Sequence, residues 1–170
     1  MATETLVSVE QYLSTAYSPD CDYVDGVVLE RNVGELNHST VQGELYFWFR
    51  SRRQELRTCA YTEQRVQVKP TRFRVPDVCV IVGEKPHEQI FTHPPFLCVE
   101  ILSPDDRVSE LQQKIDDYLE FGVPYVWVID PWSRRAWVYT AEGSREIRDG
   151  VLRTANPEIA VPLAEIFAEL

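Results

Sequence analysis

The 170-residue chain lacks the features that mark membrane, secreted or disulfide-bonded proteins. No apolar run approaches the roughly 18 residues of a membrane-spanning helix. The first residues, MATETLVSVEQYL, have neither the basic flank nor the continuous apolar stretch of a signal peptide. The cysteines are far apart and form no Cys-x-x-Cys pair; they are Cys21, Cys59, Cys79 and Cys98. We therefore expect buried thiols in the reducing cytoplasm.

Basic residues are also scarce, because 17 Lys and Arg face 27 Asp and Glu and give a formal net charge of −10. Taken as a whole, this charge argues against a nonspecific coat for nucleic acid or for an anionic membrane. With 7 Gly, 44% hydrophobic and 26% charged residues, the composition excludes a collagen-like or largely disordered chain. The length predicts one domain over residues 1–170.

The charge is unevenly distributed along the chain. Residues 1–30 carry six acids and no base, residues 50–74 carry eight bases against two acids, and residues 77–130 carry eleven acids against three bases. The basic segment 50–74 is either a solvated helix face followed by a polar loop, or a local phosphate-binding surface on an acidic protein.

Periodicity and turn signals predict a mixed fold of the α/β (α+β) class. The expected helices are a short one opening at Ser8, then about 38–56, 106–121 and 162–168. The expected strands are the hairpin 23–29 with Asp25-Gly26 as its turn, then 65–68, 75–82, 96–102, 125–131, 136–139 and a last hairpin. A central mixed β-sheet flanked by helices, with a strand–helix–strand crossover in the middle, follows from this order.

Two predicted core strands each carry one carboxylate among apolar neighbours. Since side chains alternate faces along a strand, Asp77 shares a face with Cys79, and Glu100 shares a face with Cys98. A buried, unpaired carboxylate is unfavourable. A shared divalent cation such as Mg²⁺ would explain both acids, and separate pairing of each acid with a base or a backbone amide is the alternative.

These residues belong to an ordered set that resembles the PD-(D/E)xK nuclease superfamily and, more narrowly, the Uma-type putative restriction endonucleases. The set covers roughly residues 8–140 and comprises Asp25-Gly26, His38, Pro76-Asp77, Glu100-Ile101-Leu102-Ser103-Pro104, Lys114, Tyr118, Gly122-Val123 and Asp130-Pro131. The resemblance implies a restriction-endonuclease-like fold and hydrolysis of DNA phosphodiester bonds. It also implies a homodimer, since proteins of this superfamily often pair so that both strands can be cut.

The same resemblance implies a metal site. Asp77, Glu100 and the backbone carbonyl of Ile101 would hold Mg²⁺, with Mn²⁺ as a substitute. The superfamily pattern has Lys two residues after the second acid, where this chain has Leu102. Uma-type proteins share this departure, and Lys114 of the following helix is the expected replacement.

Helical geometry permits that role for Lys114. With Leu111 as reference at about 100° per residue, Tyr118 falls near −20° and Lys114 near −60°, at the edge of the apolar stripe. The long stem of Lys114 could lie on apolar surface while its ammonium reaches the acids. The alternative is a surface lysine paired with Glu110.

The first long helix offers two further candidates. His38 lies on its apolar face, and the resemblance implies that His38 lines the site. Glu44 matches the superfamily habit of an acid on the first helix, with Asp22 and Glu30 as rival candidates.

A nuclease fold retained as a binding or regulatory module without turnover is the competing functional interpretation. Leu102 and the overall acidity motivate it.

Overall fold

A computed structural model describes residues 6–32 and 34–170. Its centre is a six-stranded sheet in the order β10-β9-β8-β7-β6-β3, in which β7 and β8 run parallel and all other neighbours run antiparallel. The strands are β3 (Thr58–Thr62), β6 (Val78–Val82), β7 (Leu97–Ile101), β8 (Tyr125–Asp130), β9 (Arg135–Thr140) and β10 (Gly143–Glu146).

Two smaller sheets accompany it. A four-stranded sheet has the order β2-β1-β5-β4, and β11 pairs with β12 as a hairpin. The strands are β1 (Asp22–Val24), β2 (Val27–Leu29), β4 (Val66–Lys69), β5 (Arg72–Arg74), β11 (Val151–Thr154) and β12 (Ile159–Pro162). The predicted Asp25-Gly26 turn joins β1 to β2 with φ of 50° and 99°, as a tight two-residue hairpin of this kind requires.

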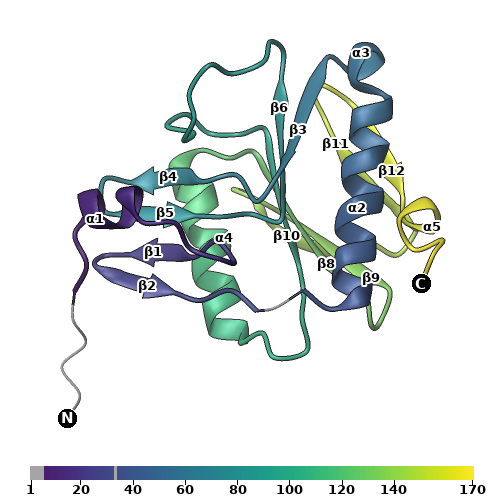
Figure 1. The fold of residues 1–170 in the computed structure, drawn as a ribbon. Coiled ribbons are helices and arrows are strands. Elements are labelled where there is room, and N and C mark those ends of the chain that lie inside the picture. The colour runs from purple at the N-terminus through teal and green to yellow at the C-terminus, as the bar shows by residue number, and fades with distance from the viewer. Residues whose placement is uncertain (1–5, 33) are drawn as a thin grey trace.

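Helices cover both faces of the six-stranded sheet (Figure 1). They are α1 (Val9–Ser14), α2 (Leu36–Ser51), α3 (Arg53–Leu56), α4 (Val108–Phe121) and α5 (Leu163–Ile166). One apolar cluster joins α2 and α5 to one face through residues such as Leu45, Val99 and Trp127. A second cluster joins α4 and β4 to the other face, where Cys79 and Cys98 lie opposite each other. This alternation is what the two apolar runs predict for strands covered on both faces.

The predicted fold class is confirmed: the protein is a mixed α+β structure with a β7–α4–β8 crossover between parallel strands. All four cysteines are free and buried, as expected. Strands β3, β5 and β10 were missed by the sequence analysis. β5 is only three residues long and β10 is largely exposed, so neither shows an apolar alternation.

Two predicted boundaries are wrong for physical reasons. The single helix predicted over 38–56 breaks at Arg52, whose φ of −103° and ψ of 12° leave the helical region. The Arg52 guanidinium stacks 4.4 Å from the Trp48 ring centroid and reaches Glu165 of α5. The strand predicted from residue 75 begins at Val78, because Pro76 has no N–H to donate and the Asp77 carbonyl accepts from the Gln42 side chain.

A buried arginine ties the four-stranded sheet to α4. Arg74 of β5 is 1% exposed and donates to Asp22 of β1 at 3.0 Å and to Asp117 of α4 at 2.8 Å. Asp22 also accepts the backbone N–H of Val75 at 2.9 Å. Three elements distant in sequence are thereby held at the place where the site is built.

None of the helices among the described residues combines the length and apolar character needed to traverse a bilayer.

Replacing Arg74 by Ala should lower the free energy of unfolding by about 3–5 kcal/mol, because two buried carboxylates lose their shared cation. Arg74→Lys keeps one charge but cannot bridge both acids, so its loss should be smaller. Urea denaturation measures both variants. The exposed Arg145→Ala, on the far edge strand β10, is the control and should change stability by less than about 0.5 kcal/mol. A loss below about 1 kcal/mol for Arg74→Ala contradicts the structural role given to this arginine.

Candidate active site

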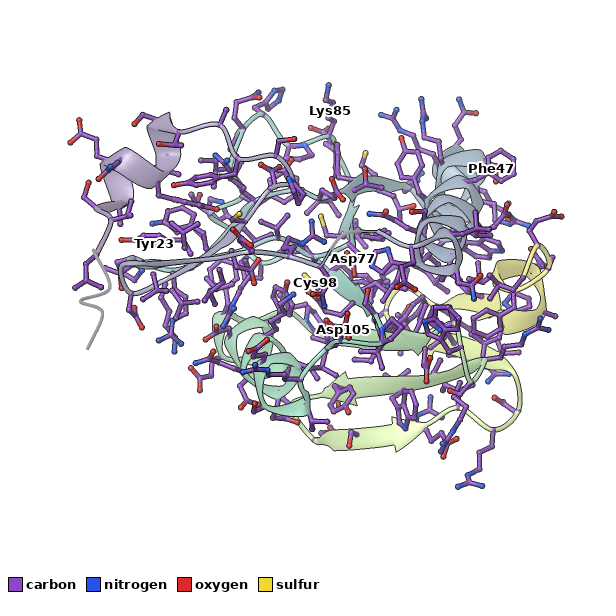
Figure 2. All side chains as sticks on the ribbon, turned by 60° about the horizontal axis from the view of Figure 1, so that its bottom comes forward. Tyr23, Phe47, Asp77, Lys85, Cys98 and Asp105 are labelled. Atoms are coloured by element: carbon purple, nitrogen blue, oxygen red, sulfur yellow. The ribbon has the colours of Figure 1, made fainter. Side chains whose placement is uncertain are left out.

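A cleft of about 570 Å³ opens where the two larger sheets, the start of α2 and the start of α4 meet. Its wall contains an unusual density of ionisable groups. The charged lining residues are Asp22, Glu30, Arg31, Glu63, Arg74, Asp77, Glu100, Asp105, Asp106, Arg107, Glu110 and Lys114, together with His38. Figure 2 shows Asp77 near the middle of the molecule with Asp105 close to it in that view.

Asp77 lies directly before β6 and is 3% exposed. Its Oδ1 accepts from the Arg31 guanidinium and lies 3.4 Å from Nε2 of His38. Its Oδ2 accepts the backbone N–H of Ile101 at 2.7 Å. The antiparallel register pairs Val78 with Val99, so Asp77 stands opposite the next residue of β7, Glu100. The two acids therefore share one face of the sheet.

Glu100 is 4% exposed and receives both of its contacts from α4. The Tyr118 hydroxyl donates to Oε1 at 2.6 Å, and Nζ of Lys114 donates to Oε2 at 3.1 Å. Lys114 and Tyr118 are four residues apart and therefore project from the same side of the helix. The alternative partner of Lys114, Glu110, pairs instead with Arg107 at 3.8 Å.

Asp22 is a third buried acid beside this pair. Its Oδ2 lies 3.8 Å from Nζ of Lys114, and its side chain also lines the cleft. The Lys114 ammonium thus sits between Asp22 and Glu100, with 22% of the lysine side chain exposed to the cleft. The lysine is held by two carboxylates that come from different sheets.

The surroundings shift the pKa values of the Asp77 and Glu100 carboxyls in opposite directions. Burial by itself raises the pKa of Asp77, but the hydrogen bond from His38 and the charge of Arg31 bring that pKa below its ordinary value. Burial raises the pKa of Glu100, and although Lys114 opposes this, the negative charges of Asp77 and Asp22 help to keep that pKa raised. Asp77 consequently holds its negative charge more firmly than Glu100 does.

The neighbouring acids raise the pKa values of His38 and Lys114. Burial lowers the pKa of His38, but its contact with Asp77 outweighs burial and raises the pKa above its usual value. Burial also disfavours the Lys114 ammonium, yet the charges of Glu100, Asp22 and Asp77 raise its pKa well above the ordinary lysine value. Lys114 is therefore a fixed positive charge next to the cleft.

The structure brings most of the predicted site residues together. His38 contacts Asp77 and Lys114 contacts Glu100. Ile101 donates its backbone N–H to Asp77. Glu44 is the exception, because it is half-buried on α2 and is not among the described residues that line the cleft. It lies about 200° around the helix from Gln42, the α2 residue that does reach Asp77.

Arg31 is the functional candidate that the sequence analysis missed. It follows the predicted hairpin in a segment without periodicity, and its side chain is 10% exposed. It contacts Asp77 and lies 3.5 Å from Glu63. A basic residue directly after the strongly acidic first 30 residues was the only signal available in the sequence.

The donor chemistry of this site fits a hard divalent cation. Mg²⁺ takes carboxylate and carbonyl oxygens, which Asp77, Glu100 and the Ile101 backbone can supply at one wall of the cleft. Among the residues described, no group of three or more His, Cys, Asp and Glu side chains is arranged as a ready metal site. A cation approaching Oδ1 of Asp77 meets the Arg31 guanidinium, which must move aside. Nδ1 of His38 is buried beside this acid without a hydrogen-bond partner among the described residues.

The basic segment 50–74 does not form one continuous surface. In the described structure, five of its eight bases lie in ion pairs, which are Arg52 with Glu165, Arg65 with Asp20, Lys69 with Glu120 and Asp117, Arg72 with Asp25 and Asp117, and Arg74 with Asp22 and Asp117. These five charges are already paired within the protein. Only Arg50, Arg53 and Arg57 remain as candidates for a phosphate-binding surface.

The architecture matches that of a solved structure. The crystal structure of a putative nuclease belonging to DUF820, from Anabaena variabilis, superposes with a TM-score of 0.80 at 22% sequence identity, over 95% of this chain and 98% of that chain. At this identity the likeness concerns the fold.

The family is shown by the sequence itself. Residues 9–165 match the model of the Uma2 family, described as putative restriction endonucleases, and the chain belongs to that family. The resemblance carried by Pro76-Asp77 and Glu100-Ile101-Leu102-Ser103-Pro104 is thereby confirmed. No protein with a curated description matches the chain.

Proposed function

We propose that the protein is a Mg²⁺-dependent endonuclease that hydrolyses phosphodiester bonds in DNA. One observation carries this proposal: two buried carboxylates, Asp77 and Glu100, share one face of the sheet at the wall of an open cleft, where the ammonium of Lys114 contacts Glu100. Membership of a family of putative restriction endonucleases supports the reaction class.

The proposed metal site consists of Asp77, Glu100 and the backbone carbonyl of Ile101. Mn²⁺, with the same preference for oxygen ligands, is expected to substitute for Mg²⁺. When bound, the metal would polarise the scissile phosphate and lower the pKa of an attacking water.

Other side chains near the proposed metal site would bind the phosphate, orient the water or position the acids. Lys114, fixed between Asp22 and Glu100, supplies a positive charge to orient the water or to stabilise the phosphoryl oxygens. Tyr118 and Arg74 are positioning residues, because Tyr118 holds Glu100 and Arg74 holds Asp22. Arg31 can donate to a phosphate oxygen with the guanidinium that it now directs at Asp77.

Cleavage of plasmid DNA with Mg²⁺ tests the reaction. Asp77→Asn and Glu100→Gln each remove a carboxylate from the site and should lower the rate at least about 100-fold, as expected when charge stabilisation in the transition state is lost. Glu142→Gln, at an exposed turn, is the matched control and should cleave like the wild type. Chelation should stop cleavage and added Mg²⁺ or Mn²⁺ should restore it. Equal cleavage by all four proteins would identify a contaminant or another site.

Calorimetric titration with Mg²⁺ in the absence of DNA tests the metal site independently of turnover. Because the Arg31 guanidinium contacts Asp77, Arg31→Gln should tighten Mg²⁺ binding about tenfold by removing a positive charge next to the cation. Asp77→Asn should abolish binding. Absence of binding to the wild type at millimolar Mg²⁺ would contradict the metal site and support a nuclease fold that binds without turnover.

The proposal includes a homodimer, which would present two sites to the two strands of a duplex. The exposed aromatic side chain of Phe47 on α2, 65% accessible beside the buried Trp48 and Phe49, supports a contact with a second subunit. Sedimentation equilibrium should give about twice the 19.7 kDa of the chain, and Phe47→Ser should shift the mass toward the monomer. A monomeric wild-type protein at tens of micromolar contradicts pairing.

A further inference from the structure

A second hollow lies beyond the cleft, between α2, α3 and the outer edge of the six-stranded sheet. Its volume is about 330 Å³. It is lined by Tyr46, Arg50, Arg53, Cys59, Ala60, Tyr61, Thr62, Gln64 and Lys85, and we call it the edge groove. Among its lining residues are three bases and no acid, on a protein whose net charge is −10. A local excess of positive charge on such a background indicates an anionic ligand.

The bases of the edge groove differ from the other bases nearby. Arg50, Arg53 and Lys85 are exposed, and none of them lies within 4.0 Å of a carboxylate oxygen among the residues described. The five paired bases of segment 50–74 have their charges neutralised within the fold. The edge groove therefore keeps three positive charges available to a ligand.

The fold brings together these three bases, which are not all close in sequence. Arg50 lies in the last turn of α2 and Arg53 begins α3, whereas Lys85 follows β6 more than thirty residues later. Antiparallel pairing of β3 with β6 sets Thr58 beside Val82, so that the chain leaving β6 runs next to the chain entering β3. Figure 2 shows Lys85 at the outer edge of the molecule, away from the interior position of Asp77.

Two tyrosines accompany the bases. Tyr46 comes from α2 and Tyr61 from β3, and both side chains are half-buried. The Tyr61 ring packs edge-on against Phe91, with 5.5 Å between ring centroids, which fixes its orientation. Cationic side chains combined with aromatic rings in a groove are the composition that binds single-stranded nucleic acid, through phosphates and stacked bases respectively.

The edge groove and the cleft are lined by neighbouring residues of two elements. Gln42 lines the cleft and Tyr46 lines the edge groove, and a spacing of four residues places them on the same side of α2. At the end of β3, Glu63 lines the cleft while Thr62 and Gln64 line the edge groove. A chain of nucleotides with one phosphate in the cleft can therefore follow this wall into the edge groove.

We propose that the edge groove binds the phosphodiester backbone of one polynucleotide strand, a few nucleotides from the phosphate held in the cleft. Arg50, Arg53 and Lys85 bind successive phosphates, and Tyr46 stacks on a base. The proposal that a strand binds here depends only on the edge groove. The proposal that this strand is aligned with a scissile phosphate in the cleft rests on the proposed nuclease function.

Equilibrium binding of a fluorescein-labelled 16-nucleotide oligo(dT) tests the proposal by fluorescence anisotropy. Chelator is present so that the wild-type protein does not cleave the probe. Each phosphate contact contributes about 0.7 to the slope of log K against log salt for single strands. The triple variant Arg50→Ala/Arg53→Ala/Lys85→Ala should reduce this slope by about 2 and weaken binding about 100-fold at 0.1 M salt.

Two comparisons make the result specific. The matched control is Arg145→Ala/Arg148→Ala, which removes exposed arginines on and just after β10 at the opposite sheet edge and should bind like the wild type. Inorganic polyphosphate of similar charge, used as competitor, separates a general anion site from a nucleic-acid site. Tyr46→Ala should weaken oligo(dT) at least threefold and leave polyphosphate competition unchanged. A parallel loss for both ligands, or for neither, overturns the stacking part of the proposal.

An unchanged affinity and salt slope in the triple variant overturns the edge groove as a strand-binding site, whether or not the protein cleaves DNA. Failure of the nuclease function has a different signature. In that case the wild type shows no metal-dependent cleavage, while the triple variant still loses oligo(dT) binding and Asp77→Asn still binds the probe.

Discussion

The structure depends on how buried carboxylates are kept charged in its interior. Asp22, Asp77 and Glu100 are each less than 5% exposed, and burial without partners would be strongly unfavourable for all three. Arg74, Arg31 and Lys114 supply the compensating charges from three separate elements. The four-stranded sheet, the segment that follows β2 and helix α4 are therefore fixed around the start of β6 and the end of β7. The same ion pairs that hold these elements together form the wall of the cleft.

This arrangement gives the site two partly opposed properties. Protein donors already serve all four carboxylate oxygens of Asp77 and Glu100, which keeps the acids stable without any ligand. Two of these donors, Arg31 and Lys114, are also the groups proposed to contact a phosphate oxygen or the attacking water. In the proposed reaction, binding of Mg²⁺ would exchange one cation for another near Asp77 and would free the guanidinium of Arg31 to contact a phosphate oxygen.

The sequence predicted the position of a side chain where that residue lies on a regular helix or strand. Alternation correctly grouped Asp77 with Cys79 and Glu100 with Cys98, and the pairing of β6 with β7 then sets these two faces side by side. Helical spacing allowed Lys114 to reach Glu100. Such patterns do not predict contacts between residues that are distant in sequence. Arg31 reaches Asp77 from an irregular segment, and the choice between Glu44 and Asp22 depended on the packing of the four-stranded sheet against α4. Likewise, the eight bases of segment 50–74 separate into paired and unpaired groups only once β3, β5 and α4 are placed.

The central claim is that Asp77 and Glu100 hold one divalent cation within the cleft. The most direct measurement is a crystal structure of the protein soaked in Mn²⁺, with the metal located by its anomalous scattering. The account predicts a single peak within about 2.0–2.4 Å of a carboxylate oxygen of each acid and of the Ile101 carbonyl, with the Arg31 guanidinium moved away from Asp77. Saturating Mn²⁺ with no peak between these two acids, and with Arg31 and Lys114 still in their present contacts, would contradict it.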